Sequence, residues 1–228
     1  MLPSLLRGLG ARLLDRVRGH ESVFTRIYQR NGWGDPESVS GPGSTRERGA
    51  SFTPDVVRLL RRLDARVLLD APCGDFNWAA EIADAVEEYV GVDMVRELVL
   101  RNQREHQRPG RRFLHADLTR DPLPRADVIL CRDCLVHFSD RDVWAALRNF
   151  RRSGSKYLLT TTFLDRPANA EIRTGGWRPL NLEAAPFHLP PPADLVDERC
   201  LHTGGIYADK RLALWALDTV PEGPRGAA

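Results

Sequence analysis

The chain has 228 residues, of which 42% are hydrophobic and 28% charged, a balance typical of a globular protein with one buried core. Its formal net charge of +2 leaves no overall excess of basic residues for binding nucleic acid or a membrane surface. With 4 cysteines a chain of this length has no disulfide framework, so we expect a reducing, cytoplasmic setting. No apolar run is long enough to span a membrane.

The N-terminal segment places apolar and basic residues at helical spacing. Residues 1–18 lack the continuous apolar stretch and the cleavage site of a signal peptide, and their pattern predicts an amphipathic helix. We expect this helix to pack on the domain or on a second subunit, and attachment to a membrane surface is the alternative. Residues 29–51 are rich in Gly, Ser and Pro and are predicted to form a long loop.

From Thr53 onward the sequence alternates predicted helices and strands. Thr53 is a suitable N-cap and Pro54 suits a first turn, so we expect a helix to begin there. Strands are then predicted at 67–70, 89–93, 112–115, 127–131 and 156–161, with helices at 76–86, 95–106 and 140–150. This alternation predicts an α/β fold in which a doubly wound, mostly parallel sheet carries helices on both faces.

The C-terminal part does not continue this alternation of strands and helices. Residues 164–193 contain many prolines and show no period, so they are predicted to form a lid or substrate loop. Strands at 194–200 and 210–217, with no helix between them, predict an antiparallel hairpin at the sheet edge. The expected organisation is a helix and loop cap over 1–52, an α/β domain over 53–217 and a flexible tail over 218–228.

Acidic side chains follow four consecutive predicted strands. They are Asp70 with Asp75, then Asp93, Asp117 and Asp133. Any one of them could cap a helix or stabilise a turn. However, the carboxyl ends of parallel strands share one edge of the sheet, which is where ligands bind in open α/β sheets. Together these carboxylates predict one acidic binding site.

The loop after the first strand argues against a phosphate-containing ligand. It lacks the G-x-G-x-x-G and P-loop patterns and places Asp75 at a helix start, where a carboxylate would repel phosphate, so an NAD-dependent enzyme is disfavoured. A ligand with adenosine and positive charge but no phosphate fits better, and S-adenosylmethionine is such a ligand. Asp93 lies about 20 residues beyond the glycine loop, where an acidic side chain can reach ribose hydroxyls.

Four segments resemble motifs of the class I S-adenosylmethionine-dependent methyltransferases. Residues 67–74 resemble motif I, 91–93 the ribose-binding motif, 115–118 the motif whose Asp contacts adenine, and 127–137 the fourth strand and its turn. The resemblance covers residues 53–217 and implies a seven-stranded Rossmann-like sheet, methyltransferase activity and S-adenosylmethionine as the cofactor. Pro72 and Phe76 replace two glycines of motif I, whereas Gly74 is kept.

The residues expected to bind the cofactor lie in these motifs and in the turns beside them. They are Asp70, Cys73, Gly74, Asp75, Trp78, Asp93, Met94, Asp117, Leu118 and Arg132.

Asp133 and His137 are the candidate catalytic residues. Methyl transfer from a sulfonium mainly requires alignment of the nucleophile, and a hydroxyl acceptor gains from a general base. The i, i+4 spacing would put both side chains on one face of a helical turn. Structural roles are open for both: a cap for Asp133, and for His137 a hydrogen-bonded side chain that holds the turn.

Cys131 and Cys134 form a C-x-x-C pair, but no second pair at matched spacing accompanies it. Buried strand-end thiols are therefore favoured over a zinc or redox site, and no metal is expected. Metal-assisted transfer is left as an alternative, because Asp75, Asp133 and His137 could converge.

The loops supply the candidate residues for binding the acceptor substrate, namely Trp33, Arg46, Trp177, Arg178, Asn181, Tyr207 and Lys210. Arg46 and Arg178 could together hold a carboxylate or phosphate, and the two tryptophans could instead pin the loops to the body. The predicted acceptor is a hydroxyl or amine of a small molecule such as a sugar or natural product. A homodimer is a further expectation, and no nucleic-acid partner is expected.

Two other functions remain open from sequence. An RNA or protein methyltransferase is disfavoured because residues 132–135 replace the Asn/Asp-Pro-Pro-aromatic turn of many amino-methylating enzymes and no basic domain is appended. A non-catalytic adenosyl-binding protein is the other alternative, which Pro72 and Phe76 suggest.

Overall fold

The computed structural model describes residues 19–200 and 204–224. The amphipathic helix predicted at 1–18 and residues 225–228 of the predicted tail lie outside the described residues.

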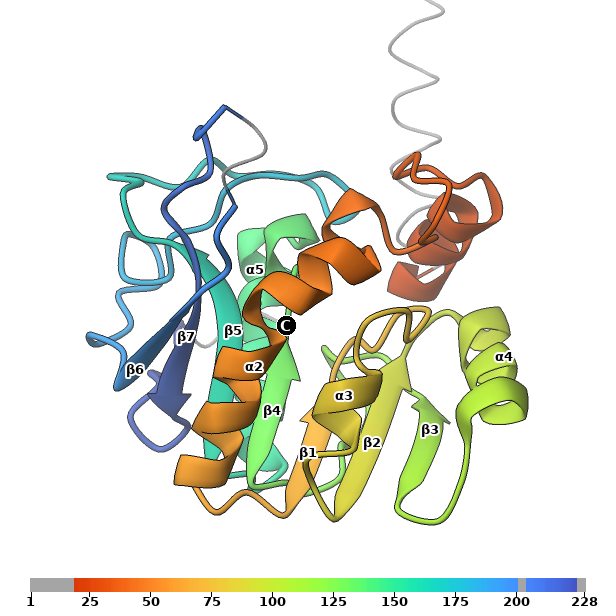
Figure 1. Ribbon diagram of the computed structural model, residues 1–228. Coiled ribbons are helices and arrows are strands. Elements are labelled where there is room, and N and C mark those ends of the chain that lie inside the picture. Colours follow the sequence, from red (N-terminus) through yellow and green to blue (C-terminus); the bar gives the residue numbers. More distant parts are fainter. Residues whose placement is uncertain (1–18, 201–203, 225–228) are drawn as a thin grey trace, which may run out of the picture.

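Within the described residues, seven strands form one sheet. They are β1 (Val67–Asp70), β2 (Glu88–Asp93), β3 (Arg111–His115), β4 (Val128–Cys131), β5 (Tyr157–Phe163), β6 (Asp194–Asp197) and β7 (Lys210–Ala216). Their order is β3-β2-β1-β4-β5-β7-β6, which runs from right to left in Figure 1. The first five strands are parallel, and β7 is antiparallel to both β5 and β6. The predicted fold class is confirmed, including the antiparallel C-terminal pair.

The helices cover both faces of the sheet (Figure 1). On one face, α2 (Arg46–Arg62) and α3 (Ala80–Ala83) pack into the cluster that holds Leu68 and Val128. On the other face, α5 (Asp140–Arg152) and the loop 164–193 pack into the cluster that holds Ile129 and Leu158. A fourth helix, α4 (Arg96–His106), lies along β2 and β3. Neighbouring strand residues alternate between the two clusters because side chains along a strand point to opposite faces.

Helix α2 begins at Arg46, so the prediction that it begins at Thr53 was wrong. The cap is Thr45, whose side chain accepts a hydrogen bond from the Arg48 amide at 3.4 Å. Pro54 lies inside the helix, where it removes one backbone hydrogen bond. The buried apolar face of α2 offsets that cost, because tertiary packing rather than local propensity supplies most of a helix's stability.

The predicted helix at 76–86 is reduced to α3. Phe76 has a φ of 56°, in the left-handed region, which prevents a helix from starting there. Its ring is buried in the core, with centroids 5.3 Å from the rings of both Tyr89 and Phe113. This aromatic packing holds the chain in the tight turn after β1. The strand predicted to reach 200 also ends earlier, at Asp197.

Candidate active site

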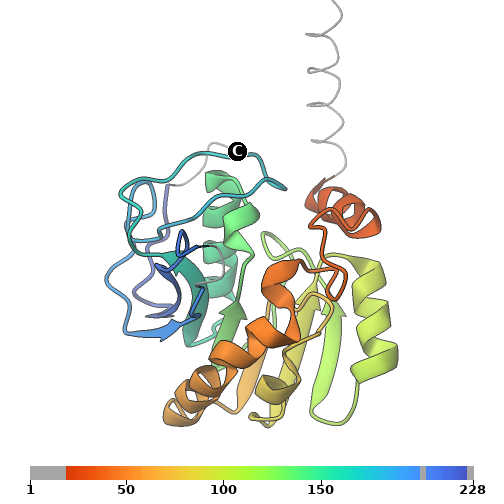
Figure 2. The same cartoon turned by 45° about the horizontal axis from the view of Figure 1, so that its top comes forward.

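The strand order reverses between β1 and β4, and a pocket of about 880 Å³, its open mouth included, lies at the carboxyl ends of these strands. Its lining comes from four strand ends, from the helical segment 19–29 and from the loop before α2. Figure 2 shows this N-terminal part lying over the strand ends. The predicted site residues that line the pocket are Trp33, Asp70, Cys73, Gly74, Asp75, Trp78, Asp93, Met94, Leu118, Arg132, Asp133 and His137.

Two buried carboxylates lie at the ends of β1 and β2. Asp70 accepts a hydrogen bond from the Tyr89 hydroxyl at 2.5 Å, and burial together with the nearby charge of Asp93 raises its pKa to about 7. Asp93 accepts backbone hydrogen bonds from Gly74 at 3.1 Å and Val95 at 2.8 Å, and burial raises its pKa to about 6. Two neighbouring acids of this kind favour a cationic ligand, because such a ligand would compensate their desolvated charge.

Asp75 holds the loop before α2 onto motif I. Its carboxylate accepts hydrogen bonds from the hydroxyls of Ser38 at 2.9 Å and Ser40 at 3.2 Å, and from the Val39 amide at 3.0 Å. A Cβ on Gly74 would lie 2.3 Å from the Ser40 oxygen, so the contact requires glycine there. The carboxylate predicted to meet the cofactor is thus already engaged by residues 38–40.

Arg132 is buried beside two aromatic rings. Its guanidinium carbon lies 4.6 Å from the ring centroid of Phe52 and 5.2 Å from that of Trp78. Its Nε and one terminal nitrogen bond Glu198 at 2.8 and 2.7 Å. The predicted cofactor residue therefore also ties the end of β4 to the chain beyond β6.

Asp133 is an ionised carboxylate held between two cations. Lys210 Nζ lies 2.7 Å and an Arg132 nitrogen 3.2 Å from its Oδ2. Burial alone would raise the pKa of Asp133, but Lys210 and Arg132 outweigh burial and hold that pKa far below its usual range. A carboxylate of such low basicity is a poor general base at neutral pH. Lys210, predicted as a substrate residue, contacts the site through Asp133.

His137 ends the 3-10 turn η2 (Leu135–His137) at the pocket wall. Its Nδ1 lies 2.7 Å from the Gly176 carbonyl, and because a carbonyl only accepts, Nδ1 carries the proton and Nε2 the lone pair. Burial lowers the pKa of His137, so the ring is neutral at physiological pH. Its centroid lies 5.2 Å from that of Trp33. His137 therefore has the protonation state of a general base.

The far end of the pocket is apolar. Met94, Val95, Leu98 and Leu118 line one side, and Phe24 and Tyr28 line it from the segment 19–29. Phe24 and Tyr28 were missed from sequence. The signal that could have found them is the spacing of Val23, Phe24, Ile27 and Tyr28, which marks one face of a helix.

Several predicted residues do not line the pocket. Arg178 is buried and donates hydrogen bonds to the Phe138 carbonyl and to Asp140, each at 2.7 Å. Arg46 is exposed, so the two arginines do not form the predicted anion site within this pocket. The others outside the lining are Asp117, Trp177, Asn181, Tyr207 and Lys210. Trp177 packs 5.3 Å from Tyr207, centroid to centroid, and Asn181 donates to the carbonyls of the loop after β5.

Cys131 and Cys134 are both buried free thiols. Among residues 19–200 and 204–224, no group of three or more His, Cys, Asp or Glu side chains is placed to hold a metal ion. No helix in this same part of the chain is long and apolar enough to cross a membrane.

Comparison with known proteins gives a family match and several structural matches. Residues 68–155 match a family model described as "Methyltransferase domain". Human N-acetylserotonin methyltransferase in complex with SAM has a similar structure, with a TM-score of 0.51 and 19% identity over 71% of this chain and 50% of that chain. Magnesium protoporphyrin IX methyltransferase from Synechocystis PCC 6803 with bound SAM gives a TM-score of 0.48 and 17% identity over 67% and 80% of the two chains. DesVI of Streptomyces venezuelae gives 0.43 and 16% identity over 52% of each chain.

The matched residues and the shared fold confirm the resemblance to class I S-adenosylmethionine-dependent methyltransferases that the motifs predicted. Residues 68–155 therefore match a methyltransferase domain, and the chain spans half the length of the N-acetylserotonin methyltransferase chain. A search of curated proteins gives no match.

Proposed function

We propose that this protein binds S-adenosylmethionine and methylates a hydroxyl or amine of a small molecule. The observation that carries the proposal is the pocket between β1 and β4, which joins an apolar end, two buried acids and a neutral histidine.

The residues of the pocket fit the cofactor. Met94, Leu98 and Leu118 offer an apolar wall for a flat base. Asp93 keeps lone pairs beyond those used by the two backbone amides, and these can accept ribose hydroxyls. The negative charge of Asp70 and Asp93 favours a ligand with an ammonium and a sulfonium.

Phe76 does not obstruct this site, although it replaces a motif I glycine. Its ring packs in the core against Tyr89 and Phe113, and it is not part of the pocket lining. Pro72 does line the pocket, beside Gly74. Since the pocket stays open with both residues in place, they give little support to a non-catalytic protein with a closed cofactor site.

His137 would act as the general base. The bound cofactor supplies a methyl group on a sulfonium, which is already a good leaving group. Nε2 of His137 can take the proton of an acceptor hydroxyl, because Gly176 fixes the other ring nitrogen as a donor. Asp133 would act as a fixed negative charge near this proton, since its pairing with Lys210 keeps it ionised.

A small acceptor suits the shape of the site. The segment 19–29, Trp33 and the loop residues Val39, Ser40 and Ser44 contribute to the lining, which leaves a partly covered pocket rather than an open basic surface. The formal net charge of +2 gives no electrostatic footprint for a nucleic acid.

The test is transfer of a labelled methyl group from S-adenosylmethionine to a panel of small hydroxyl and amine compounds. With an accepted hydroxyl compound, His137→Gln should lower kcat by about 10²-fold or more while the Kd for S-adenosylhomocysteine changes by less than about threefold. His188→Asn, at an exposed position outside the pocket, is the matched control and should match the wild type. Loss of folding or of cofactor binding in parallel with kcat would assign His137 a structural role instead.

A further inference from the structure

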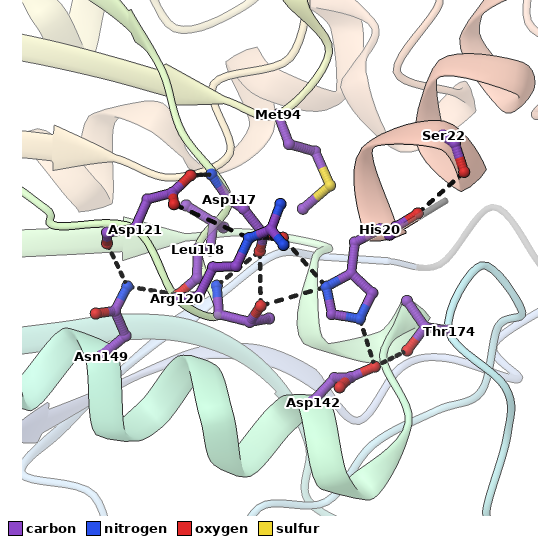
Figure 3. A network of polar contacts seen from close by, with 12 residues as sticks. His20, Ser22, Met94, Asp117, Leu118, Arg120, Asp121, Asp142, Asn149 and Thr174 are labelled. Carbon is purple, nitrogen blue, oxygen red and sulfur yellow. Dashed lines mark hydrogen bonds and ion pairs between the residues drawn. The ribbon is translucent and has the colours of Figure 1, made fainter. Parts of the chain in front are cut away.

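His20 joins the N-terminal segment to two carboxylates of the domain. Its Nδ1 lies 3.3 Å from Asp117 Oδ2 and its Nε2 lies 3.0 Å from Asp142 Oδ2. Thr119 Oγ1 lies 3.2 Å from the same Nδ1 and donates to Asp117 Oδ1 at 2.7 Å. Figure 3 shows the imidazole reaching from the helix at 19–29 into this network. Because both ring nitrogens face carboxylates, both can donate only when the ring is charged.

This contact connects parts of the chain that are distant in sequence. Asp117 follows β3, and Asp142 lies in the first turn of α5. Asp142 also accepts a hydrogen bond from Thr174 of the loop 164–193, at 2.5 Å. The His20 ring lies 6.1 Å from the ring of Phe138, a pocket residue. One side chain thus holds three segments at the apolar end of the pocket.

The segment that His20 holds is itself a wall of the pocket. Phe24 and Tyr28 line the pocket, and Phe24 lies 5.8 Å from Phe138 and 6.3 Å from Trp33, measured between ring centroids. Met94 and Leu118 line it too, and Figure 3 places both beside the His20 network. A ligand whose flat base occupies the apolar end would therefore lie under this segment.

We propose that His20 is a positioning residue for the cofactor: by bridging Asp117 and Asp142 it holds residues 19–33 closed over the adenine end of the pocket, and the cofactor exchanges when this bridge opens. The proposal deepens the proposed function and rests on it for the identity of the ligand.

The carboxylates keep other partners when the bridge opens, so opening need not unfold the domain. Arg120 Nε lies 3.2 Å from Asp117 Oδ2, and Asp142 accepts from Thr174. The other charged groups at this place are Asp121, 3.9 Å from Arg120, and Glu21, which pairs with His115 at 3.3 Å.

The bridge should weaken as the pH rises. Hydrogen bonds with Asp117 and then Asp142 raise the pKa of His20 to about 9, against the burial that lowers it. A base whose pKa is raised in the closed form stabilises that form fully below its free pKa of 6.5 and loses this effect as the pH rises through about 9. Closure should therefore weaken progressively across this interval.

The experiment measures dissociation of S-adenosylhomocysteine by stopped-flow tryptophan fluorescence from about pH 6.5 to about pH 9.5. In the wild type the dissociation rate should rise about tenfold over this range, whereas His20→Gln should dissociate rapidly throughout. His188→Asn is the control and should follow the wild type. Since Asp70 and Asp93 also titrate near this range, the two rates are compared at each pH. Equal rates and equal pH dependence in His20→Gln and the wild type would overturn the proposal.

Hydrogen exchange of the ligand-free proteins gives a second, independent readout. The backbone amides of residues 21–30 should exchange about tenfold faster in His20→Gln than in the wild type or His188→Asn at neutral pH. Unchanged exchange in this segment would show that His20 does not hold it closed, whatever the result of the ligand-dissociation experiment. If S-adenosylhomocysteine binds none of the proteins, the proposed function fails, and exchange alone then decides whether His20 holds the segment closed.

Discussion

In the proposed function, Asp93 is the residue that would orient the cofactor most directly. Both of its carboxylate oxygens accept backbone amides, one of them from Gly74 of motif I. Asp93→Asn would turn an NH₂ group towards one of these N–H donors, and it would remove the negative charge offered to the ligand. We expect the Kd for S-adenosylhomocysteine to rise about 10- to 100-fold in a calorimetric titration. Asp64→Asn, at an exposed position, should bind as the wild type does, and an unchanged Kd in Asp93→Asn would contradict the ribose assignment.

We expect the stability of the protein to depend on pH through Asp70. Burial and Asp93 raise its pKa from 3.8 to about 7 in the folded protein. The protonated carboxyl therefore stabilises the fold fully below pH 3.8, and this stabilisation is lost as the pH rises through about 7. Asp70→Asn keeps an acceptor for the Tyr89 hydroxyl and removes the buried charge. In thermal unfolding, the free energy of unfolding of Asp70→Asn minus that of the wild type should be about 1–2 kcal/mol larger near pH 8 than near pH 5. A gain that is the same at both pH values would show that Asp70 does not carry this charge.

The sequence places four of the five predicted carboxylates in the pocket lining, all but Asp117, but it does not indicate their partners. Asp70 and Asp93 end strands and Asp133 lies two residues beyond β4, and the parallel sheet brings such positions to one edge. Their partners are distant in sequence: Lys210 reaches Asp133 from β7, and Ser38 reaches Asp75 from the loop before α2. No local pattern encodes such pairs. The roles of the site residues therefore stay predictions, although the pocket brings most of them together.

At the level of elements, α2 shows how packing overrides a local signal. Thr53 and Pro54 together have the pattern of a helix start, yet both lie inside α2 because its apolar face is buried. The short strands β1 and β4 were easier to predict, because each contains an apolar run that is buried on both faces of the sheet. The helix predicted to begin at Phe76 does not form there, because the Phe76 ring packs in the core against Tyr89 and Phe113.

The position of Thr53 inside α2, rather than at its N-cap, can be tested by mutation. Its hydroxyl is buried and has no hydrogen-bond partner among the described residues. Thr53→Val keeps the shape and removes the unpaired group, so we expect the free energy of unfolding to stay the same or rise by about 1 kcal/mol. Thr45→Ala, which removes the N-cap of α2, should lower it by about 1 kcal/mol. A clear loss of stability in Thr53→Val during denaturant unfolding would show that the hydroxyl is satisfied in the folded protein.

Across the whole molecule, the N-terminal segment and the α/β domain line one pocket. The cap predicted from composition contributes Phe24, Tyr28 and Trp33 to the same pocket as the strand ends. Strand order could be anticipated from the alternation of elements and from the resemblance, whereas the seating of the cap depends on long-range contacts such as His20 with Asp117. A ligand that fills this pocket would therefore contact both parts.

The most direct test of this account is calorimetric titration of the full chain with S-adenosylmethionine, S-adenosylhomocysteine and NAD. We expect about micromolar binding of the two sulfur ligands and no binding of NAD, because the pocket offers buried acids and no phosphate-binding loop. Binding of NAD, or of neither sulfur ligand, would contradict the assignment of the pocket to S-adenosylmethionine.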